Sequence, residues 1–322
     1  MLITILTILA AAVLMTAAIA YICYRMAFYN PKPKNVDPER IDIPDGEIYE
    51  VFRDRMTEWV RWTRSLPRET VEIISEDGLK LRGKYYEYAP GAPMELMFHG
   101  YRGHAERDLS GGVYRCFALG RSALIVDQRS CGDSEGDTIT FGIREHRDCL
   151  AWLDYAVKRF GPEQKIILTG ISMGAATVLM AAGRELPDNV IGVLADCGYT
   201  TAREIMMEVI RQMKLPPKLC YPFVKLGARL YAGFDPDSGS ALEAAPNIRV
   251  PVIFFHGEAD DFVPCSMSRK NFDACTARKK LVTIPGAGHG LAFPVDEEGY
   301  LASLREFFGP GASAQKADEV KQ

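Results

Sequence analysis

The sequence predicts an α/β fold with a mostly parallel, eight-stranded sheet, helices on both faces and a small helical cap. Two observations predict it. Short apolar segments with the character of strands alternate with helical segments along most of the chain, which is typical of an open parallel sheet. Before this alternation begins, Asp77-Gly78 joins two strand-like segments at 70–76 and 80–88, and that dipeptide is a strong signal of an antiparallel hairpin.

Six further apolar segments have the length and composition of buried strands. They span residues 94–98, 123–127, 166–169, 190–195, 252–255 and 281–284, and helical segments at 112–119, 144–160 and 173–184 lie between them. The interval 200–245 is too long for a single crossover between strands. Its helical pieces, 202–213 and 219–231, predict a cap over the carboxyl edge of the sheet; an ordinary surface excursion is the alternative.

The segment Gly170-Ile-Ser172-Met-Gly174 contains the first candidate catalytic residue. It follows an apolar strand directly and continues into a helical stretch, so its middle residue lies on a sharp, strained corner. The two glycines leave room for neighbouring backbone to approach closely. We therefore expect the Ser172 hydroxyl at the carboxyl edge of the sheet, over the positive end of a helix. Because the chain has 28 glycines, a chance glycine-rich turn is the alternative for the pattern alone.

A nucleophilic serine requires a base, and the base requires an acid that orients it. His289 follows the last strand, and Asp260 follows the strand before it; both belong at the sheet edge toward which Ser172 points. The chain order of serine, acid and histidine is the one used with a Gly-x-Ser-x-Gly turn. Asp196, which ends another strand, and Asp261, which adjoins Asp260, remain alternatives for the acid.

Two backbone N–H groups are predicted to bind the oxyanion of the reaction. One belongs to Met173, directly after the candidate nucleophile. The other belongs to Tyr101, in a glycine-rich loop at 99–103 that follows the strand at 94–98. His99, in the same loop, is expected to be a structural hydrogen-bonding residue.

Five motifs occur along the chain in a characteristic order. They are His99-Gly, Asp127-Gln-Arg-Ser-Cys-Gly-Asp-Ser-Glu-Gly136, Gly170-Ile-Ser-Met-Gly, His256-Gly-Glu-Ala-Asp-Asp-Phe-Val-Pro and Gly-His289-Gly. Over residues 71–308 the chain thereby resembles the α/β-hydrolase superfamily. More narrowly, it resembles the serine aminopeptidase-like and monoacylglycerol-lipase-like branch, including bacterial members with an amino-terminal membrane anchor.

The resemblance implies acyl transfer in two steps through a triad of Ser172, His289 and Asp260, without a metal or an organic cofactor. One departure from the family pattern is Ser130-Cys131, where relatives often carry a glycine or alanine followed by a histidine. That loop is expected to be structural, so the departure does not change the predicted chemistry.

Residues 1–24 carry no charged side chain and are dominated by Leu, Ile, Ala and Val. At about 1.5 Å per helical residue, this run is long enough to cross a hydrocarbon core of about 30 Å, so we expect a transmembrane anchor in the cell membrane. A cleaved signal peptide is the alternative, because Ala18-Ile-Ala20 resembles a cleavage site. Basic residues follow the run at 25, 32, 34 and 40 and none precedes it, which predicts a cytoplasmic catalytic domain.

Residues 25–69 are expected to form a linker and an amphipathic helix. Four prolines in 30–45 indicate an extended linker, and apolar residues at helical spacing over 46–66 indicate the helix. The helix is expected to pack on the main domain, which spans 70–309; the alternative is that it lies in the membrane interface through Trp59 and Trp62. The small, polar tail at 310–322 is expected to be disordered.

Composition argues against several other classes of protein. A formal net charge of -4 and a pI near 5.8 disfavour a nucleic-acid-binding protein. Eight scattered cysteines without a Cys-x-x-Cys pair disfavour a zinc ribbon and a disulfide framework. The predicted function is a membrane-anchored serine hydrolase that cleaves a carboxylic ester or a related acyl bond in a small-molecule substrate. Amphiphilic acyl substrates are attractive, because the chain is expected to be tethered to a bilayer and to have an apolar cap. The alternatives are a serine peptidase or aminopeptidase-type amide hydrolase, a non-catalytic membrane-tethered binding protein, and a cysteine nucleophile at Cys265.

Overall fold

The computed structural model describes residues 1–32 and 39–309, and one eight-stranded sheet forms its centre. The strands are β1 (Glu69–Ile74), β2 (Lys80–Tyr86), β3 (Met94–Phe98), β4 (Ser122–Val126), β5 (Ile166–Ile171), β6 (Val190–Asp196), β7 (Val252–Gly257) and β8 (Lys279–Ile284). Their order is β1-β2-β4-β3-β5-β6-β7-β8. β2 pairs antiparallel with β1 and β4, and the remaining pairs are parallel. The predicted fold class is confirmed, including the opening hairpin.

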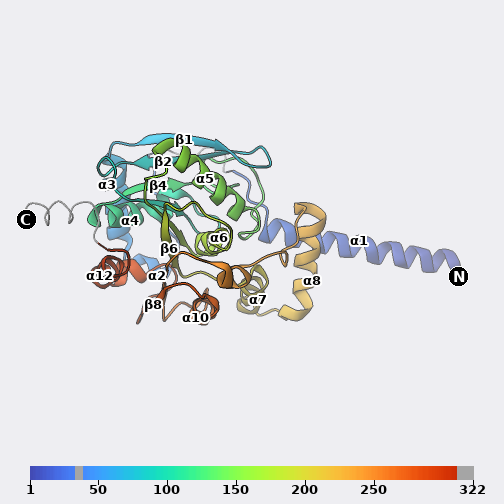
Figure 1. The fold of residues 1–322 in the computed structure, drawn as a ribbon. Helices are drawn as coiled ribbons and strands as arrows, with labels where there is room; N and C mark the ends of the chain where they lie inside the picture. Colours follow the sequence, from blue (N-terminus) through green and yellow to red (C-terminus); the bar gives the residue numbers. More distant parts are fainter. Residues whose placement is uncertain (33–38, 310–322) are drawn as a thin grey trace, which may run out of the picture.

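Helices cover both faces of the sheet (Figure 1). One face carries α3 (Arg53–Ser65), α4 (Ala105–Ala118), α11 (Ala292–Val295) and α12 (Glu297–Phe308); the other carries α5 (Glu145–Phe160), α6 (Met173–Ala182) and α10 (Cys265–Ala274). The parallel strands β3, β4 and β7 are buried along their whole length, because layers of helix on both sides exclude water.

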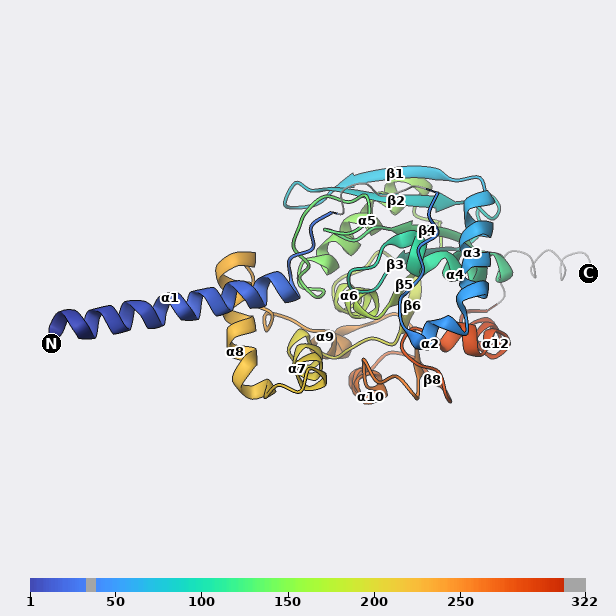
Figure 2. The ribbon, with the colours of Figure 1, turned by 180° about the vertical axis from the view of Figure 1, so that it is seen from behind.

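The amphipathic segment expected at 46–66 is two helices, α2 (Glu47–Glu50) and α3. α3 packs on α4 through Trp59, which is buried. The contact is close, because a Cβ on Gly111 of α4 would lie 2.8 Å from the Trp59 ring. The segment therefore packs on the main domain, as expected, and Trp59 does not face a membrane. Figures 1 and 2 both place α3 at the end of the body away from the amino-terminal helix.

The interval 200–245 forms α7 (Ala202–Gln212), α8 (Pro217–Gly227), the π-helical turn η1 (Ala228–Ala232), α9 (Ala241–Ala244) and the 3-10 turn η2 (Ala245–Asn247). Its most extensive helical partner was not expected. It is α1 (Leu2–Ala27), which lies against α8 and η1. α8 crosses α1 where α1 enters the body of the protein (Figure 2).

α1 is long and apolar enough to cross a membrane, with a mean hydropathy of 2.6 over its most apolar window. Its carboxyl-terminal turns belong to the folded body, because Tyr24 is buried there, and so is Phe28, directly after the helix. The linker prolines Pro33 and Pro38 and the tail at 310–322 lie outside the described residues.

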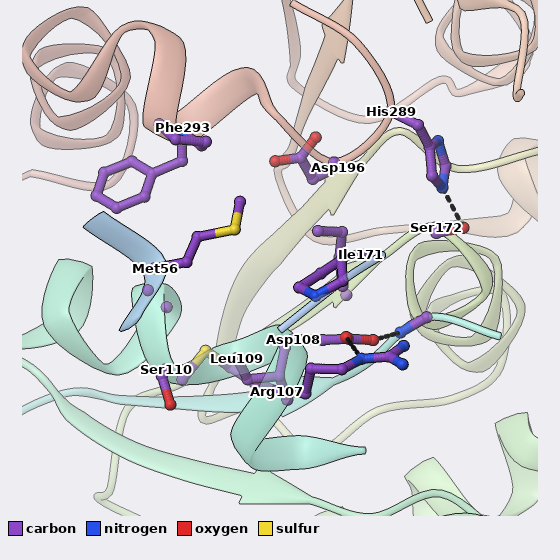
Figure 3. A pocket seen from close by; sticks show the side chains of 18 of the residues that line it. Met56, Arg107, Asp108, Leu109, Ser110, Ile171, Ser172, Asp196, His289 and Phe293 are labelled. Carbon is purple, nitrogen blue, oxygen red and sulfur yellow. Dashed lines mark hydrogen bonds and ion pairs between the residues drawn. The ribbon is translucent and has the colours of Figure 1, made fainter. Parts of the chain in front are cut away.

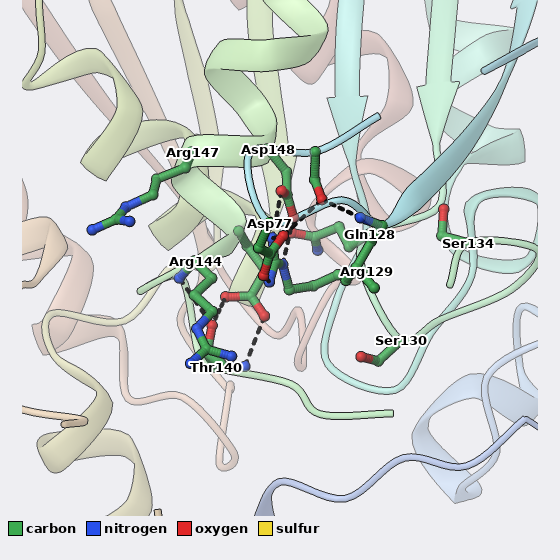
Figure 4. Close-up of polar contacts among 12 residues, drawn as sticks. Asp77, Gln128, Arg129, Ser130, Ser134, Thr140, Arg144, Arg147 and Asp148 are labelled. Carbon is green, nitrogen blue, oxygen red and sulfur yellow. Dashed lines mark hydrogen bonds and ion pairs between the residues drawn. The ribbon is translucent and has the colours of Figure 1, made fainter. Parts of the chain in front are cut away.

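The loop at 127–136, which holds the Ser130-Cys131 departure, is tied down by buried polar contacts (Figure 4). The Arg129 guanidinium donates to Asp148 at 2.6 Å and to Asp77 at 2.8 Å, which joins the loop to α5 and to the β1–β2 turn. The Asp127 carboxylate accepts backbone N–H groups at 2.7 and 2.9 Å. These contacts hold the backbone in place and support the structural role expected for this loop.

Candidate active site

Ser172 lies between β5 and α6 with φ 56° and ψ -116°, a backbone conformation that residues other than glycine seldom adopt. The flanking glycines make the turn possible. A Cβ on Gly170 would lie 2.1 Å from the Gly174 carbonyl oxygen, and a Cβ on Gly174 would lie 2.0 Å from the Phe98 carbonyl oxygen. The strained serine corner and the close backbone approach follow the sequence-based expectation.

Ser172, His289 and Asp260 lie in one hydrogen-bonded chain. Ser172 Oγ is 2.9 Å from His289 Nε2, and His289 Nδ1 is 2.7 Å from Asp260 Oδ2; Figure 3 shows the first of these contacts beside the cavity. His289 lies in the loop after β8 and Asp260 in the loop after β7, at the same edge of the sheet as Ser172. The structure thus brings together three residues that are far apart in the sequence.

Several donors hold the Asp260 carboxylate in place. Its Oδ1 accepts the backbone N–H groups of Phe262 and Val263 at 3.0 and 2.8 Å. His256 Nε2 lies 3.2 Å from Oδ2. Burial acts to raise the pKa of Asp260, but hydrogen bonds from His256 and His289 outweigh it and lower the pKa to about 2. Asp260 is therefore ionised at neutral pH, the state that stabilises an imidazolium.

Asp196, the alternative acid, has a different partner. Its Oδ2 accepts a hydrogen bond from the Tyr300 hydroxyl at 2.9 Å, and its Oδ1 has no hydrogen-bond partner among the described residues. Burial raises its pKa. Asp196 lines the cavity next to Ser172 (Figure 3) but makes no hydrogen bond to His289, so the geometry favours Asp260 as the orienting acid.

The loop after β3 lies next to the serine, as expected for an oxyanion-binding loop. A Cβ on Gly100 would lie 4.0 Å from Ser172 Oγ. The Gly100 N–H donates to Asp108 Oδ2 at 3.1 Å, and Arg107 Nε donates to Asp108 Oδ1 at 2.7 Å; both interactions shape the loop. On the other side of the serine, Met173 begins α6, where the first N–H groups have no partner within the helix.

His99 makes the structural contacts expected for it. Its Nε2 accepts the backbone N–H of Gln128 at 3.0 Å, and its Nδ1 lies 2.7 Å from the Gly100 carbonyl oxygen. Burial lowers the pKa of His99, which keeps the ring neutral and able to accept that hydrogen bond. His99 therefore connects the loops after β3 and β4 rather than facing the cavity.

A cavity of about 220 Å³ opens beside Ser172 and His289. Its walls are largely apolar and include Met56, Trp59, Leu109, Leu194 and Phe293. Tyr49, in α2, also lines it and donates its hydroxyl to the His289 carbonyl oxygen at 3.0 Å. Sequence reasoning missed the wall from α2 and α3, because their apolar residues indicate packing but do not indicate against what. The interval 200–245, expected to cover the site, contributes no residue to this cavity.

One group of potential metal ligands occurs within the described ranges 1–32 and 39–309: Cys197, Asp260 and His289. A metal ion there would compete with Ser172 and Asp260 for the imidazole, and the Cys197 thiol, whose pKa burial raises well above its usual value, is a poor thiolate donor. Burial also raises the pKa of Cys265, the opposite of what a cysteine nucleophile requires. All eight cysteines are free.

Comparisons with known proteins agree with this fold. A model described as the alpha/beta hydrolase family matches residues 96–302. The chain is 27% identical to YqkD of Bacillus subtilis over 190 residues, 59% of this chain and 62% of that protein, which is less than two thirds of its length. It is 25% identical to the lysophosphatidylserine lipase ABHD12 of Danio rerio over 65% of this chain and 53% of that protein. An esterase from Pyrococcus furiosus has a similar structure, with a TM-score of 0.65 at 22% identity over 87% of this chain and 97% of that one.

Proposed function

The chain belongs to the alpha/beta hydrolase family, and from this premise we propose that it is a membrane-anchored serine hydrolase that cleaves a carboxylic ester or a related acyl bond. The observation that carries the proposal is the continuous contact from Ser172 Oγ through His289 to Asp260, at 2.9 and 2.7 Å. Nucleophile, base and orienting acid stand in the order and spacing that acyl transfer requires.

In the proposed mechanism, His289 Nε2 removes the proton from Ser172 as its oxygen attacks the carbonyl carbon of the substrate. Asp260 keeps the other ring nitrogen protonated and stabilises the imidazolium that forms. The N–H groups of Met173 and Tyr101 bind the oxyanion, and removing such a donor costs about 3–4 kcal/mol of transition-state stabilisation. His289 then protonates the leaving group. In the second step His289 removes a proton from water, whose oxygen attacks the acyl-enzyme, and returns that proton to Ser172 as the carboxylic acid leaves.

The similarity to proteins described as an esterase and as a lipase favours an ester over an amide as the bond that is cleaved. The apolar cavity next to Ser172 suits an acyl chain. A serine peptidase or aminopeptidase-type hydrolase is the second candidate. It is favoured by one observation: the Asp196 carboxylate lines the cavity with one oxygen unpartnered, a site that an amine could occupy.

We propose α1 as a single-pass anchor, with the catalytic domain in the cytoplasm. The packing of α1 supports an anchor over a cleaved signal, because Ala20, the last residue of the possible cleavage motif, is buried against α8. Processing after Ala20 would remove that contact. Inverted vesicles test the topology, because a cytoplasmic domain faces outward in them and should be digested by added protease. Protection of the domain from the protease would contradict the proposed orientation.

A fluorophosphonate probe tests the chemistry. The wild type should be labelled, Ser172→Ala should not, and Ser303→Ala, a control on α12 that does not line the cavity, should be labelled as the wild type is. Hydrolysis of activated esters, lysolipids and aminoacyl amides by the wild type that has not been exposed to the probe then separates the two candidate activities. Labelling of Ser172→Ala would place the nucleophile elsewhere. A folded wild type that is inert to the probe and to all three substrate classes would indicate a binding protein instead.

A further inference from the structure

The exposed part of α1 is too short to cross a membrane by itself. Side chains from Leu2 to Met15 are exposed, and beyond them the helix begins to contact the body. About 14 helical residues extend about 21 Å, whereas a hydrocarbon core is about 30 Å thick and needs about 20 residues. The first charged side chain of the chain is Arg25. A bilayer that α1 spans must therefore extend past Met15, to about Tyr21.

That depth brings the bilayer to α8 and η1. A Cβ on Gly227 would lie 2.3 Å from the Ala20 carbonyl oxygen, so the backbones of α8 and α1 touch. The Tyr231 hydroxyl of η1 donates to the Ala17 carbonyl oxygen at 3.0 Å. Figures 1 and 2 both show α8 crosswise to α1, at the end of the body nearest the amino terminus. If α1 stands upright in a bilayer, α8 therefore lies along its surface.

The outward side chains of this region suit such a place. The α7–α8 turn, α8 and η1 expose Met213, Leu215, Leu219 and Leu230, the last two at 67% and 58%; we call these four residues the docking face. Lys214 and Lys218, also exposed, stand among them. Exposed apolar side chains mixed with lysines are typical of helices that lie in the headgroup layer of an anionic membrane.

Tyrosine residues of α1 lie at the same depth as α8 and η1. The rings of Tyr21 and Tyr24 lie 5.2 and 5.9 Å from that of Tyr231. The Arg25 guanidinium stands 4.0 Å above the ring of Tyr29. Tyrosines followed directly by a basic residue are characteristic of the boundary between hydrocarbon and headgroups.

We propose that the docking face is inserted into the surface layer of a lipid bilayer, so that α8 and η1 form a second membrane contact beside α1. The proposal rests on the anchoring part of the proposed function and not on its chemistry. Together the two contacts fix the orientation of the whole body, because a crosswise helix prevents the domain from tilting about a single anchor. The end of α1 also reaches the loop after β3, where the Tyr101 hydroxyl donates to the Ala27 carbonyl oxygen at 2.9 Å.

Quenching of tryptophan by brominated lipids tests the proposal. Leu219→Trp and Leu230→Trp are each made in the full-length protein and reconstituted into vesicles of phosphatidylcholine and phosphatidylglycerol. Ala302→Trp is the matched control, since Ala302 is exposed on α12 at the opposite end of the body. Emission from the tryptophans at 219 and 230 should be quenched when the acyl chains carry bromine. Emission from the control and from the wild type should be unchanged. Of the three native tryptophans, Trp59 and Trp152 are buried in the body, and Trp62, on α3, packs against Phe117 at the end of the body away from α1.

Two further readouts separate the ways in which the proposal can fail. Flotation with the vesicles reports the anchor, and fluorophosphonate labelling reports the chemistry. A protein that floats, and whose tryptophans at 219 and 230 are quenched no more than the control, would overturn the docking while leaving the anchor and the hydrolase intact. Emission that depends on the protein-to-lipid ratio but not on bromination would assign the face to a second copy of the chain, which also overturns it. A protein that does not float would overturn anchor and docking together.

Discussion

At the scale of single residues, the two buried carboxylates near His289 differ in what they can do for it. Asp260 is ionised and 2.7 Å from the imidazole, whereas Asp196 is bound to Tyr300. We expect Asp260→Asn to lower kcat by about 10⁴-fold, the size of loss seen when a triad acid can no longer hold the useful tautomer. Asp196→Asn should cost far less. Initial rates on an activated ester measure both, and a larger loss in Asp196→Asn would exchange the two roles.

The same carboxylate links stability to pH. The pKa of Asp260 is lowered from 3.8 to about 2 in the folded state, so its contribution is complete above about pH 4 and is lost as the pH falls from about 4 to 2. The shift corresponds to about 2 kcal/mol. The melting temperature should therefore drop more between about pH 5 and about pH 3 for the wild type than for Asp260→Asn. Equal slopes in the two proteins would contradict the shift.

Residues whose roles follow from a local pattern could be predicted from the sequence. The serine corner depends only on its two glycines and on the strand and helix that flank it. His289 and Asp260 could be placed because the carboxyl ends of parallel strands share one edge. The hydrogen bond from Tyr49 to His289 could not be foreseen, since nothing local to Tyr49 records a partner 240 positions away.

At the scale of elements, a buried cluster of charged side chains joins β3, α4 and the turn before β4. Its carboxylate is Glu95 on β3, which is fully buried. It accepts hydrogen bonds at 2.7 Å from Arg115, on α4, and from Arg121, in the turn before β4. Burial acts to raise the pKa of Glu95, but the two guanidinium groups outweigh it and lower the pKa to about 2. The carboxylate therefore neutralises charge that α4 and β4 bring into the core.

Removing that charge should be costly. Glu95→Gln leaves two buried guanidinium groups without a counterion, and breaking a buried ion pair in this way costs about 3–5 kcal/mol of unfolding free energy. Glu72→Gln is the matched control, because Glu72 lies on β1, at the edge of the same sheet, in exposed pairs with Lys80 and Arg82, which are worth about 0–1 kcal/mol. Denaturant unfolding in detergent compares them. Similar losses in the two variants would show that burial does not set the cost.

Element types were easier to predict than element partners. The strands follow from apolar runs, and their predicted bounds differ from the observed ones by at most two residues. The break between α2 and α3 and the change from α8 to the π-helical η1 were not predicted, because apolar spacing continues through both. That α8 packs on α1 depends on Gly227 allowing contact with Ala20, and a glycine in a helical pattern does not identify the helix that will approach it.

At the scale of the whole molecule, α1 has two parts with different roles. The part up to Met15 is exposed, whereas the carboxyl-terminal part and the residue after it supply Tyr24 and Phe28 to the core. Phe28 packs edge-on against Phe141 and Phe234 at 5.9 and 5.3 Å. The proposed membrane anchor is therefore continuous with the hydrophobic core, and a boundary drawn at the end of the apolar run would cut through a folded unit.

Two truncations separate those parts. Removing residues 1–15 should abolish flotation with vesicles and leave both the melting temperature and the rate of fluorophosphonate labelling close to those of the full chain. Removing residues 1–28 should destabilise the body, because loss of a buried phenylalanine alone costs about 3–5 kcal/mol. It should also slow labelling, because the hydrogen bond that holds Tyr101 to Ala27 is lost.

Removal of residues 1–28 takes away both the packing of Phe28 and the hydrogen bond from Tyr101 to Ala27, and the point variant Phe28→Ala separates these two contributions. It empties the site between Phe141 and Phe234 but keeps Ala27, the carbonyl acceptor for Tyr101. We expect it to lower the melting temperature while labelling at low temperature stays near the wild-type rate. Removal of residues 1–28, in contrast, should lower both the melting temperature and the labelling rate. If that truncation melts and labels as the full chain does, the end of α1 is a passive tether, and the core of this hydrolase closes without it.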